Sequence, residues 1–121
     1  MKAKTILCID DNETALRVRR MLLESKGYRV LTASTAEAGT ESVDSQVDLV
    51  ILDYRLADGN SEQLSVDLKR RWPSLPILLL SGYPNVPDSA KFAADTFLTK
   101  GGLATELLAA VESLLDRKAN P

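Results

Sequence analysis

Four apolar residues in a row, Leu49 to Leu52, lie between two acids, Asp48 and Asp53. An uninterrupted run of this kind is typical of a strand that is buried on both faces, as in a parallel sheet covered by helices. Residues 54–60 predict a loop directly after it, which places Asp53 at the C-terminal edge of the strand. Ligands bind at that edge in open α/β sheets. The run therefore predicts both a class of fold and a position for a functional site.

The same alternation of apolar runs and helical spacing extends along the chain. The other predicted strands cover residues 5–9, 28–32, 77–80 and 96–99, and the predicted helices cover 13–26, 34–44, 61–72, 88–94 and 104–118. Five strands alternating with helices predict one α/β domain over residues 1–121, with a parallel sheet and helices on both faces. Prolines before residue 88 leave room for two turns at most, so we expect the fourth helix to be short or disordered.

Two helices carry local signals. In the first, Ala15, Val18 and Leu22 recur at spacings of three and four, which predicts a helix, and Leu16, Met21 and Leu23 widen its apolar face beyond one stripe. A face this wide indicates either a broad core face with partly exposed edges or a docking patch at Leu16 and its neighbours. In the second, Ser34 followed by Glu37 resembles a capping box.

Composition excludes several classes of function. Lysine and arginine nearly balance the acids, with a formal charge of −2, which argues against binding nucleic acid or anionic membrane through bulk charge. The chain has no histidine, so no histidine-based metal site or triad can form. The single cysteine, Cys8, lies in an apolar run and predicts a small buried residue in a reducing compartment. Apolar runs are too short for a membrane span or a signal peptide, and we expect a cytoplasmic protein.

Residues with chemical potential stand at the ends of these strands. Asp10 and Asp11 follow the first strand, Asp53 ends the third, Ser81 ends the fourth and Lys100 follows the fifth. Right-handed crossovers bring the C-terminal ends of parallel strands to one edge of the sheet. We therefore expect these five residues to meet there.

Such a set suits a phosphoryl group. Clustered carboxylates need a cation, and few oxygen ligands without histidine favour Mg²⁺ over Ca²⁺ or Zn²⁺. A lysine and a serine hydroxyl can hold phosphoryl oxygens, and a carboxylate among them can act as the nucleophile. Each residue has an ordinary explanation when taken singly, such as a helix cap, a turn, a solvated lysine or, for Phe97, a core aromatic. Their order along alternating strands is what favours the site.

These residues resemble a response-regulator receiver domain of two-component signalling, over essentially the whole chain. The resemblance rests on Asp10-Asp11, on Asp53 after Val-Ile-Leu, on Ser81-Gly82 and on Lys100. It implies a flavodoxin-like sheet of order 2-1-3-4-5. It also implies a phospho-accepting switch that takes a phosphoryl group onto Asp53, with Mg²⁺, from a histidine kinase or a histidine phosphotransfer protein.

The resemblance further assigns individual roles. Asp11 and Asp53 would bind Mg²⁺ directly and Asp10 through water, and the backbone carbonyl of Arg55 would be the third protein ligand. Lys100 and Ser81 would hold the phosphoryl oxygens. Ser81 and Phe97 would be the residues that move on activation, and the first helix, at Leu16 and its neighbours, would dock the kinase. The output protein is not indicated, nor whether the domain is free-standing or part of a longer protein.

Several residues depart from the pattern of the family. Gly101 replaces the usual proline after the lysine, Ala57 stands at another usual proline, and Ser61 replaces a common glycine. The interval from Ser81 to Lys100 is also about one helical turn short.

Two other functions stay open. A pseudo-receiver would serve only as a protein-interaction module, although it would not need clustered carboxylates. A haloacid-dehalogenase-like phosphatase also forms an aspartyl phosphate, but it needs a second aspartate two residues after the nucleophile, where this chain has Arg55. We therefore expect a binding switch that is no enzyme beyond assisting its own phosphorylation and dephosphorylation.

Overall fold

A computed structural model describes residues 3–56, 59–82 and 86–119. In chain order the elements are β1 (Thr5–Ile9), α1 (Glu13–Glu24), β2 (Arg29–Ala33), α2 (Ala36–Ser42), β3 (Leu49–Asp53), β4 (Arg55–Leu56), β5 (Gly59–Asn60), α3 (Ser61–Arg71), β6 (Ile77–Ser81), α4 (Asp88–Phe92), β7 (Thr96–Thr99) and α5 (Ala104–Ala119). None of the described helices is long and apolar enough to cross a bilayer.

The sheet has five parallel strands in the order β2-β1-β3-β6-β7. Strands β4 and β5 form a separate two-stranded antiparallel sheet. Counting only the strands of the large sheet, the order is 2-1-3-4-5, which confirms the prediction.

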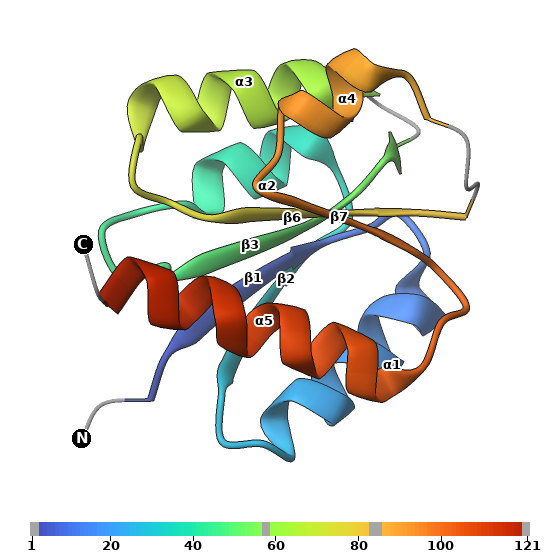
Figure 1. Ribbon diagram of the computed structural model, residues 1–121, viewed down its shortest axis with the longest axis vertical. Coiled ribbons are helices and arrows are strands. Elements are labelled where there is room, and N and C mark those ends of the chain that lie inside the picture. Colours follow the sequence, from blue (N-terminus) through green and yellow to red (C-terminus); the bar gives the residue numbers. More distant parts are fainter. Residues whose placement is uncertain (1–2, 57–58, 83–85, 120–121) are drawn as a thin grey trace.

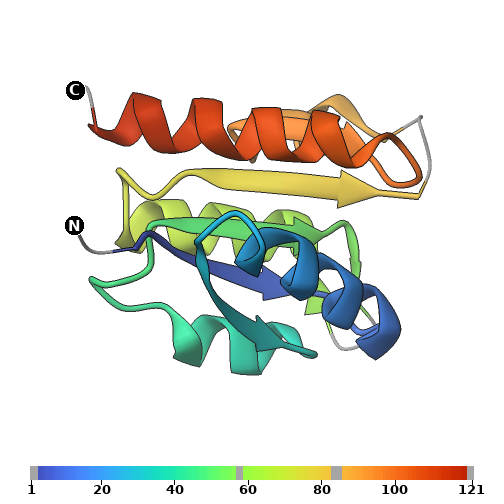
Figure 2. The same ribbon diagram turned by 90° about the horizontal axis from the view of Figure 1, so that it is seen from below.

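Helices cover both faces of this sheet. Figure 1 shows α2, α3 and α4 on one face and α1 and α5 on the other, and Figure 2 shows the second face from below. The central strand β3 supplies both cores in alternation, because successive side chains of a strand point to opposite faces. Val50 and Leu52 pack on the side of α2 and α3. Leu49 and Ile51 pack on the side of α1 and α5, so the predicted burial on both faces is confirmed.

The wide apolar face of α1 is buried along one stripe and exposed at its edge. Leu16, Arg19 and Leu23 are buried, whereas Val18 is 62% exposed. The buried stripe of Leu16, Arg19 and Leu23 lies next to the exposed stripe that contains Val18. Because it contains Arg19, the buried stripe looks polar in the sequence. Leu16, expected at a docking surface, therefore belongs to the core.

The start of α2 is one residue later than expected. Thr35, not Ser34, is the N-cap, and its side chain accepts a hydrogen bond from the backbone N–H of Ala38 at 3.0 Å. Gly39 faces β1 so closely that an added Cβ would lie 2.5 Å from Cδ1 of Ile9. The glycine that weakens the helix in the sequence is therefore what lets α2 pack on the sheet.

The fourth helix is short, as expected, and it is formed rather than disordered. It covers the five residues of α4, and the Ser65 hydroxyl on α3 donates a hydrogen bond to the carbonyl of Ala93 at its end. Residues 83–85, part of the loop predicted before it, lie outside the described residues.

Candidate functional site

Three carboxylates converge at the C-terminal ends of β1 and β3. Asp10 follows β1 and is fully buried, and its backbone N–H donates to the carbonyl of Ala33 at 3.1 Å. Asp53 is the last residue of β3 and is 6% exposed, while Asp11 is exposed. One oxygen from each carboxylate lies within 4.8 Å of the others. The sheet thus brings these three acids together, as the strand ends predicted.

Lys100 joins this cluster from the far edge of the sheet. It follows β7, where its backbone N–H donates to the carbonyl of Ser81 at 2.6 Å. Its ammonium Nζ lies 2.9 Å from Oδ2 of Asp10 and 3.1 Å from Oδ1 of Asp53. One cation therefore bridges two buried carboxylates from neighbouring strands.

A second cation, Arg19, was not predicted. Its Nη1 and Nη2 atoms lie 3.4 and 3.5 Å from Oδ2 of Asp10, and the side chain is buried. The other oxygen of Asp10 accepts the backbone N–H of Asn12 at 2.9 Å. A signal existed in the sequence, because Arg19 lies three residues after Leu16 and four before Leu23 on one helical stripe. An arginine on an apolar stripe indicates a buried acid as its partner.

Burial and the neighbouring charges move the pKa values in opposite directions. Burial pushes the pKa of Asp10 upward, but the N–H of Asn12 together with Lys100 and Arg19 outweighs it, so the pKa is lowered. At Asp53, burial and the negative charge of Asp10 outweigh Lys100 and raise the pKa. Burial lowers the pKa of Lys100, yet its two carboxylate partners raise it overall. Of Asp10 and Asp53, Asp53 is therefore the carboxylate whose negative charge is less well compensated.

Cys8, in the strand before the site, has no part in this chemistry. Burial raises the pKa of its thiol to about 12, so it stays protonated, as expected for a small buried residue.

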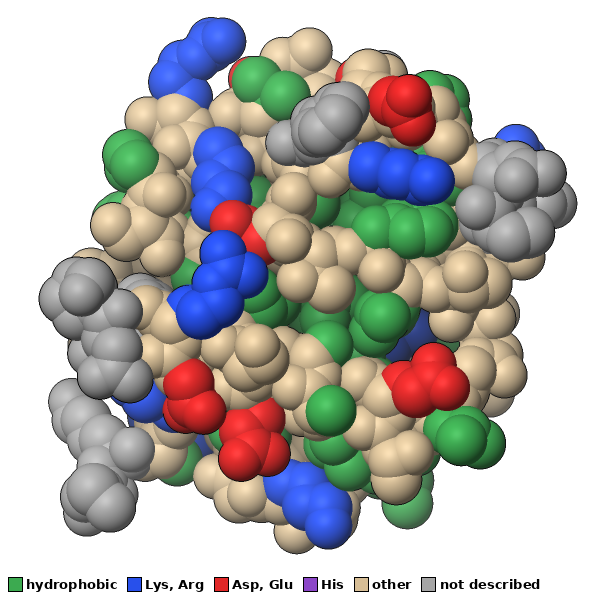
Figure 3. Space-filling model, viewed as in Figure 1, with side chains coloured by type: hydrophobic (Ala, Val, Ile, Leu, Met, Phe, Trp, Pro, Cys, Tyr) green, Lys and Arg blue, Asp and Glu red, His purple; other side chains and the backbone are tan. Residues whose placement is uncertain are grey.

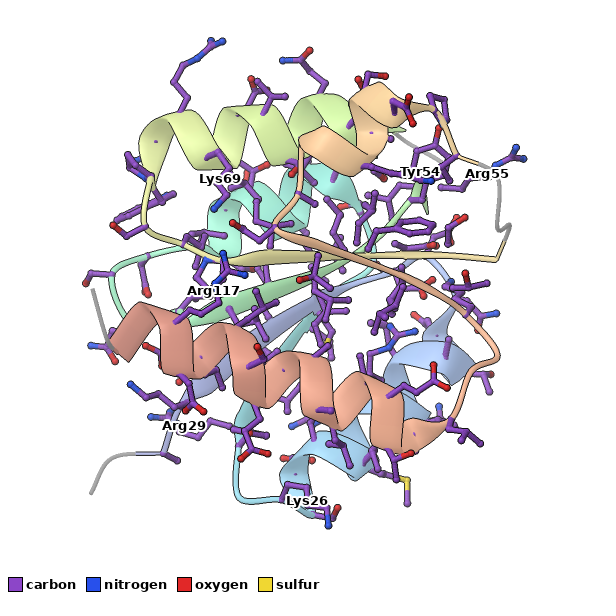
Figure 4. The ribbon with its side chains drawn as sticks, viewed as in Figure 1. Lys26, Arg29, Tyr54, Arg55, Lys69 and Arg117 are labelled. Carbon is purple, nitrogen blue, oxygen red and sulfur yellow. The ribbon has the colours of Figure 1, made fainter. Side chains whose placement is uncertain are left out.

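The other predicted residues occupy different positions around the cluster. Ser81 is buried at the end of β6, opposite Thr99 of β7 in the sheet. Phe97 is half-buried on the α2–α3 side of the sheet, with Nζ of Lys91 5.7 Å from the centre of its ring. Arg55 is exposed and begins β4, and its side chain points away from the molecule in Figure 4.

The lysine loop explains one departure from the family pattern. Gly101 has φ +87°, a left-handed conformation that proline cannot adopt and glycine adopts without strain. A side chain at Gly102 would bring its Cβ to 3.0 Å from Oε2 of Glu106. The backbone after Lys100 therefore follows a path that favours glycine at both positions and that proline at position 101 would not allow.

The donor set fits a hard divalent cation. It consists of carboxylate oxygens only, from residues 10, 11 and 53, which lie close enough to share an ion. Mg²⁺ prefers such oxygens and keeps several waters, so it needs few protein ligands.

Comparison with known proteins decides the family. A sequence model of the response regulator receiver domain matches residues 6–112. The chain belongs to this family. The receiver domain is 33% identical over 116 residues to the KDP operon transcriptional regulatory protein KdpE of Escherichia coli, covering 93% of this chain and 51% of that protein.

Solved structures agree with this assignment. A CheY-like receiver domain protein from Methanospirillum hungatei matches with a TM-score of 0.91 and 25% identity, covering 98% of each chain. The response regulator protein TrrA from Thermotoga maritima, in complex with Mg(2+)-BeF, matches with a TM-score of 0.85 and 26% identity, over 92% of this chain and 98% of that one.

This receiver domain spans about half the length, or less, of the first curated relatives that it matches, between 28% and 51%. It is thus a receiver domain of two-component response regulators. Receiver domains bind Mg²⁺ at an acidic pocket, and the cluster of Asp10, Asp11 and Asp53 is an acidic group that could hold a metal ion.

Proposed function

We propose that this receiver domain is a phospho-accepting switch, with Asp53 as the acceptor. The observation that carries the proposal is the ammonium of Lys100, 3.1 Å from Asp53 and 2.9 Å from Asp10, beside the three-carboxylate cluster. A phosphoryl group needs a nucleophile, a metal and a fixed cation at one point, and this arrangement supplies the residues for all three.

The donor is a phosphohistidine of a histidine kinase or a histidine phosphotransfer protein. A carboxylate oxygen of Asp53 attacks phosphorus, the P–N bond breaks, and the imidazole nitrogen keeps the electron pair and takes up a proton. Lys100 then moves from the carboxylates to one phosphoryl oxygen, and the hydroxyl of Ser81 donates to another.

For the metal, Asp11 and Asp53 would be direct ligands, Asp10 a ligand through water, and the Arg55 carbonyl the third protein ligand. Mg²⁺ bound there would neutralise the carboxylates and the phosphoryl oxygens during transfer. The complex of the similar protein TrrA with Mg(2+)-BeF supports a Mg²⁺ site in this domain.

The output of the switch would be a change in partner binding. Ser81 lies in the strand next to β7, which carries Phe97. Movement of the Ser81 hydroxyl toward the phosphoryl group would therefore reach the face where Phe97 and Lys91 lie. The output partner is a protein, and we expect the switch to act in the cytoplasm without nucleic-acid or membrane binding of its own. On the face drawn in Figure 3, acidic and basic side chains are interspersed, with no broad patch of one sign.

Intact mass spectrometry after incubation with acetyl phosphate and Mg²⁺ tests the proposal. We expect one added phosphate that survives long enough to be measured, and its loss when Mg²⁺ is removed by a chelator. Continuous release of phosphate without accumulation would show a phosphatase instead. A protein that binds Mg²⁺ but never gains mass would be a pseudo-receiver, used only for protein contacts.

Kinase docking is expected on α1, but through different residues than Leu16. Val18 and Met21 are the exposed apolar residues of this helix. Val18 also lines a groove between α1 and the start of α5 that reaches Lys100. This mostly apolar groove ends at Lys100, which contacts the acceptor Asp53, so a donor protein seated in it would lie close to the site of phosphotransfer.

Val18→Glu is therefore expected to slow phosphotransfer by about tenfold when the donor is a histidine kinase that phosphorylates the wild-type chain. The reason is that an apolar residue that the kinase would bury on docking is replaced by a charge. The rate with acetyl phosphate should not change. Leu31→Glu, at an exposed apolar residue of β2 outside the groove, is the matched control and should keep both rates. Equal slowing of Val18→Glu with both donors would contradict docking through α1.

A further inference from the structure

The buried guanidinium of Arg19 has no role in the proposed phosphotransfer chemistry. It comes from the core face of α1, and it is 8% exposed. Both of its terminal nitrogens donate to one atom, Oδ2 of Asp10, at 3.4 and 3.5 Å. The same oxygen accepts a hydrogen bond from the ammonium of Lys100 at 2.9 Å. Two cations thus share a single carboxylate oxygen.

This sharing changes the charge of the site. Asp10, Asp11 and Asp53 carry three negative charges, and Lys100 and Arg19 carry two positive charges, so one net negative charge remains. Without Arg19 the net charge of the site would be −2, which one divalent cation would neutralise completely. Arginine stays charged inside a protein, so this compensation is permanent.

The partners of the two carboxylates also differ. Asp10 holds Arg19 and the N–H of Asn12 in addition to Lys100. Among the described residues, Lys100 is the cation placed against Asp53. When Lys100 turns to a phosphoryl oxygen, Asp10 therefore stays buried with an arginine and a backbone N–H still on its oxygens.

We propose that Arg19 is a positioning residue that acts through Asp10 as a resident counter-cation of the site. It holds the charge of Asp10 in the absence of metal, it weakens the affinity of the site for Mg²⁺, and it frees Lys100 for the phosphoryl group. The inference rests on the proposed function, and it adds a regulatory property to it: the Mg²⁺ concentration at which the switch operates is set by a residue of α1.

Loss of Arg19 should raise the affinity for Mg²⁺ and lower the rate of phosphorylation. A merely structural role would predict a loss of both. Removing Arg19 removes a positive charge near the metal, and electrostatic attraction of a dication then increases. Removing it also leaves Lys100 as the remaining side-chain cation on a fully buried carboxylate, so Lys100 is held there more tightly. Mg²⁺ should bind more tightly and phosphorylation at saturating Mg²⁺ should be slower.

Arg19→Met keeps the length and apolar character of the side chain and removes its charge, and it tests the proposal in three measurements. Mg²⁺ titration followed by NMR shifts should give a dissociation constant lower by on the order of tenfold. Phosphorylation by acetyl phosphate at saturating Mg²⁺ should slow by a similar factor. The melting temperature without metal should fall, and saturating Mg²⁺ should raise it more than in the wild-type protein.

Two variants control the experiment. Arg20→Met removes a charge from the same helix, but Arg20 is exposed and pairs with Glu24 at 3.2 Å, so Mg²⁺ affinity should stay at the wild-type value. Arg19→Lys restores the charge and should bring Mg²⁺ affinity back toward wild type. An unchanged or weaker Mg²⁺ affinity in folded Arg19→Met would overturn the inference, as would equal effects of the two methionine variants. Absence of Mg²⁺ binding in the wild-type protein would instead refute the proposed function.

Discussion

Replacing Asp53 by asparagine is expected to abolish phosphorylation while the fold is retained. The amide fills nearly the same volume at the end of β3, but it is a poor nucleophile toward phosphorus. Intact mass spectrometry after acetyl phosphate and Mg²⁺ should show no added phosphate in Asp53→Asn, whereas the wild-type chain should gain one. Asp67→Asn, at an exposed carboxylate of α3, is the matched control and should be phosphorylated as the wild type is.

The same change should raise thermal stability in metal-free buffer at neutral pH. The pKa of Asp53 is raised by burial and by Asp10, so its charged form is less stable in the folded chain than in the unfolded chain. This cost appears as the pH rises above the ordinary carboxyl pKa of 3.8 and grows until the pH has passed the raised pKa of the folded chain. The gain in melting temperature should therefore disappear near pH 4, and Mg²⁺ should reduce it by stabilising the wild-type protein.

Phosphate uptake by Asp53→Asn at the wild-type rate would show that another residue is the acceptor. A lower melting temperature at neutral pH would show that the pairing of Asp53 with Lys100 outweighs burial and the repulsion from Asp10.

Lys100→Met is expected to impair both stability and chemistry. The ammonium is the shared partner of Asp10 and Asp53, and removal of one member of a buried ion pair costs about 3–5 kcal/mol. The Lys100 side chain is 29% exposed, and Asp10 keeps Arg19, so we expect a smaller loss of about 2 kcal/mol. That corresponds to a fall of about 8 °C in melting temperature for a domain of this size.

The pH dependence identifies the cause of this loss. Lys100 lowers the pKa of both carboxylates, so its contribution to stability is present when they are ionised and is lost as they become protonated. The difference in melting temperature between wild type and Lys100→Met should therefore be largest at neutral pH. The part that acts through Asp53, whose pKa is raised, should shrink toward pH 4, and the part that acts through Asp10, whose pKa is lowered, should be lost only below the ordinary carboxyl pKa of 3.8. Phosphorylation by acetyl phosphate should fall by on the order of 100-fold, because a fixed cation on a transferred phosphoryl oxygen is lost.

Lys69→Met is a useful comparison, because Lys69 of α3 also pairs with an aspartate, Asp95, at 2.6 Å. Lys69 lies away from the acceptor. The Lys69→Met protein should therefore be less stable than wild type but should be phosphorylated at the wild-type rate. A Lys100→Met protein that is as stable as wild type and is phosphorylated at the wild-type rate would contradict the role of the bridge.

The sequence by itself determined the sheet and the place of the site. Apolar runs identify buried strands independently of how the helices pack, and parallel strands bring their C-terminal ends to one edge whatever the exact crossover. Asp10, Asp53 and Lys100 could thus be grouped across 90 residues of chain. The short α4 also followed from local chemistry, since the prolines before it restrict the backbone directly.

Only the tertiary structure decided which face of α1 is buried and what the site contains besides the predicted residues. The stripe of Leu16, Arg19 and Leu23 and the stripe of Val18 and Leu22 are both compatible with helical spacing. The choice depends on a long-range pair, because Arg19 can be buried only with Asp10 beside it. The close contact of Gly39 with Ile9 and the left-handed Gly101 are likewise settled by packing. In α1, the spacing of residues shows which side chains could face the core. The ion pair of Arg19 with Asp10 decides which of them do.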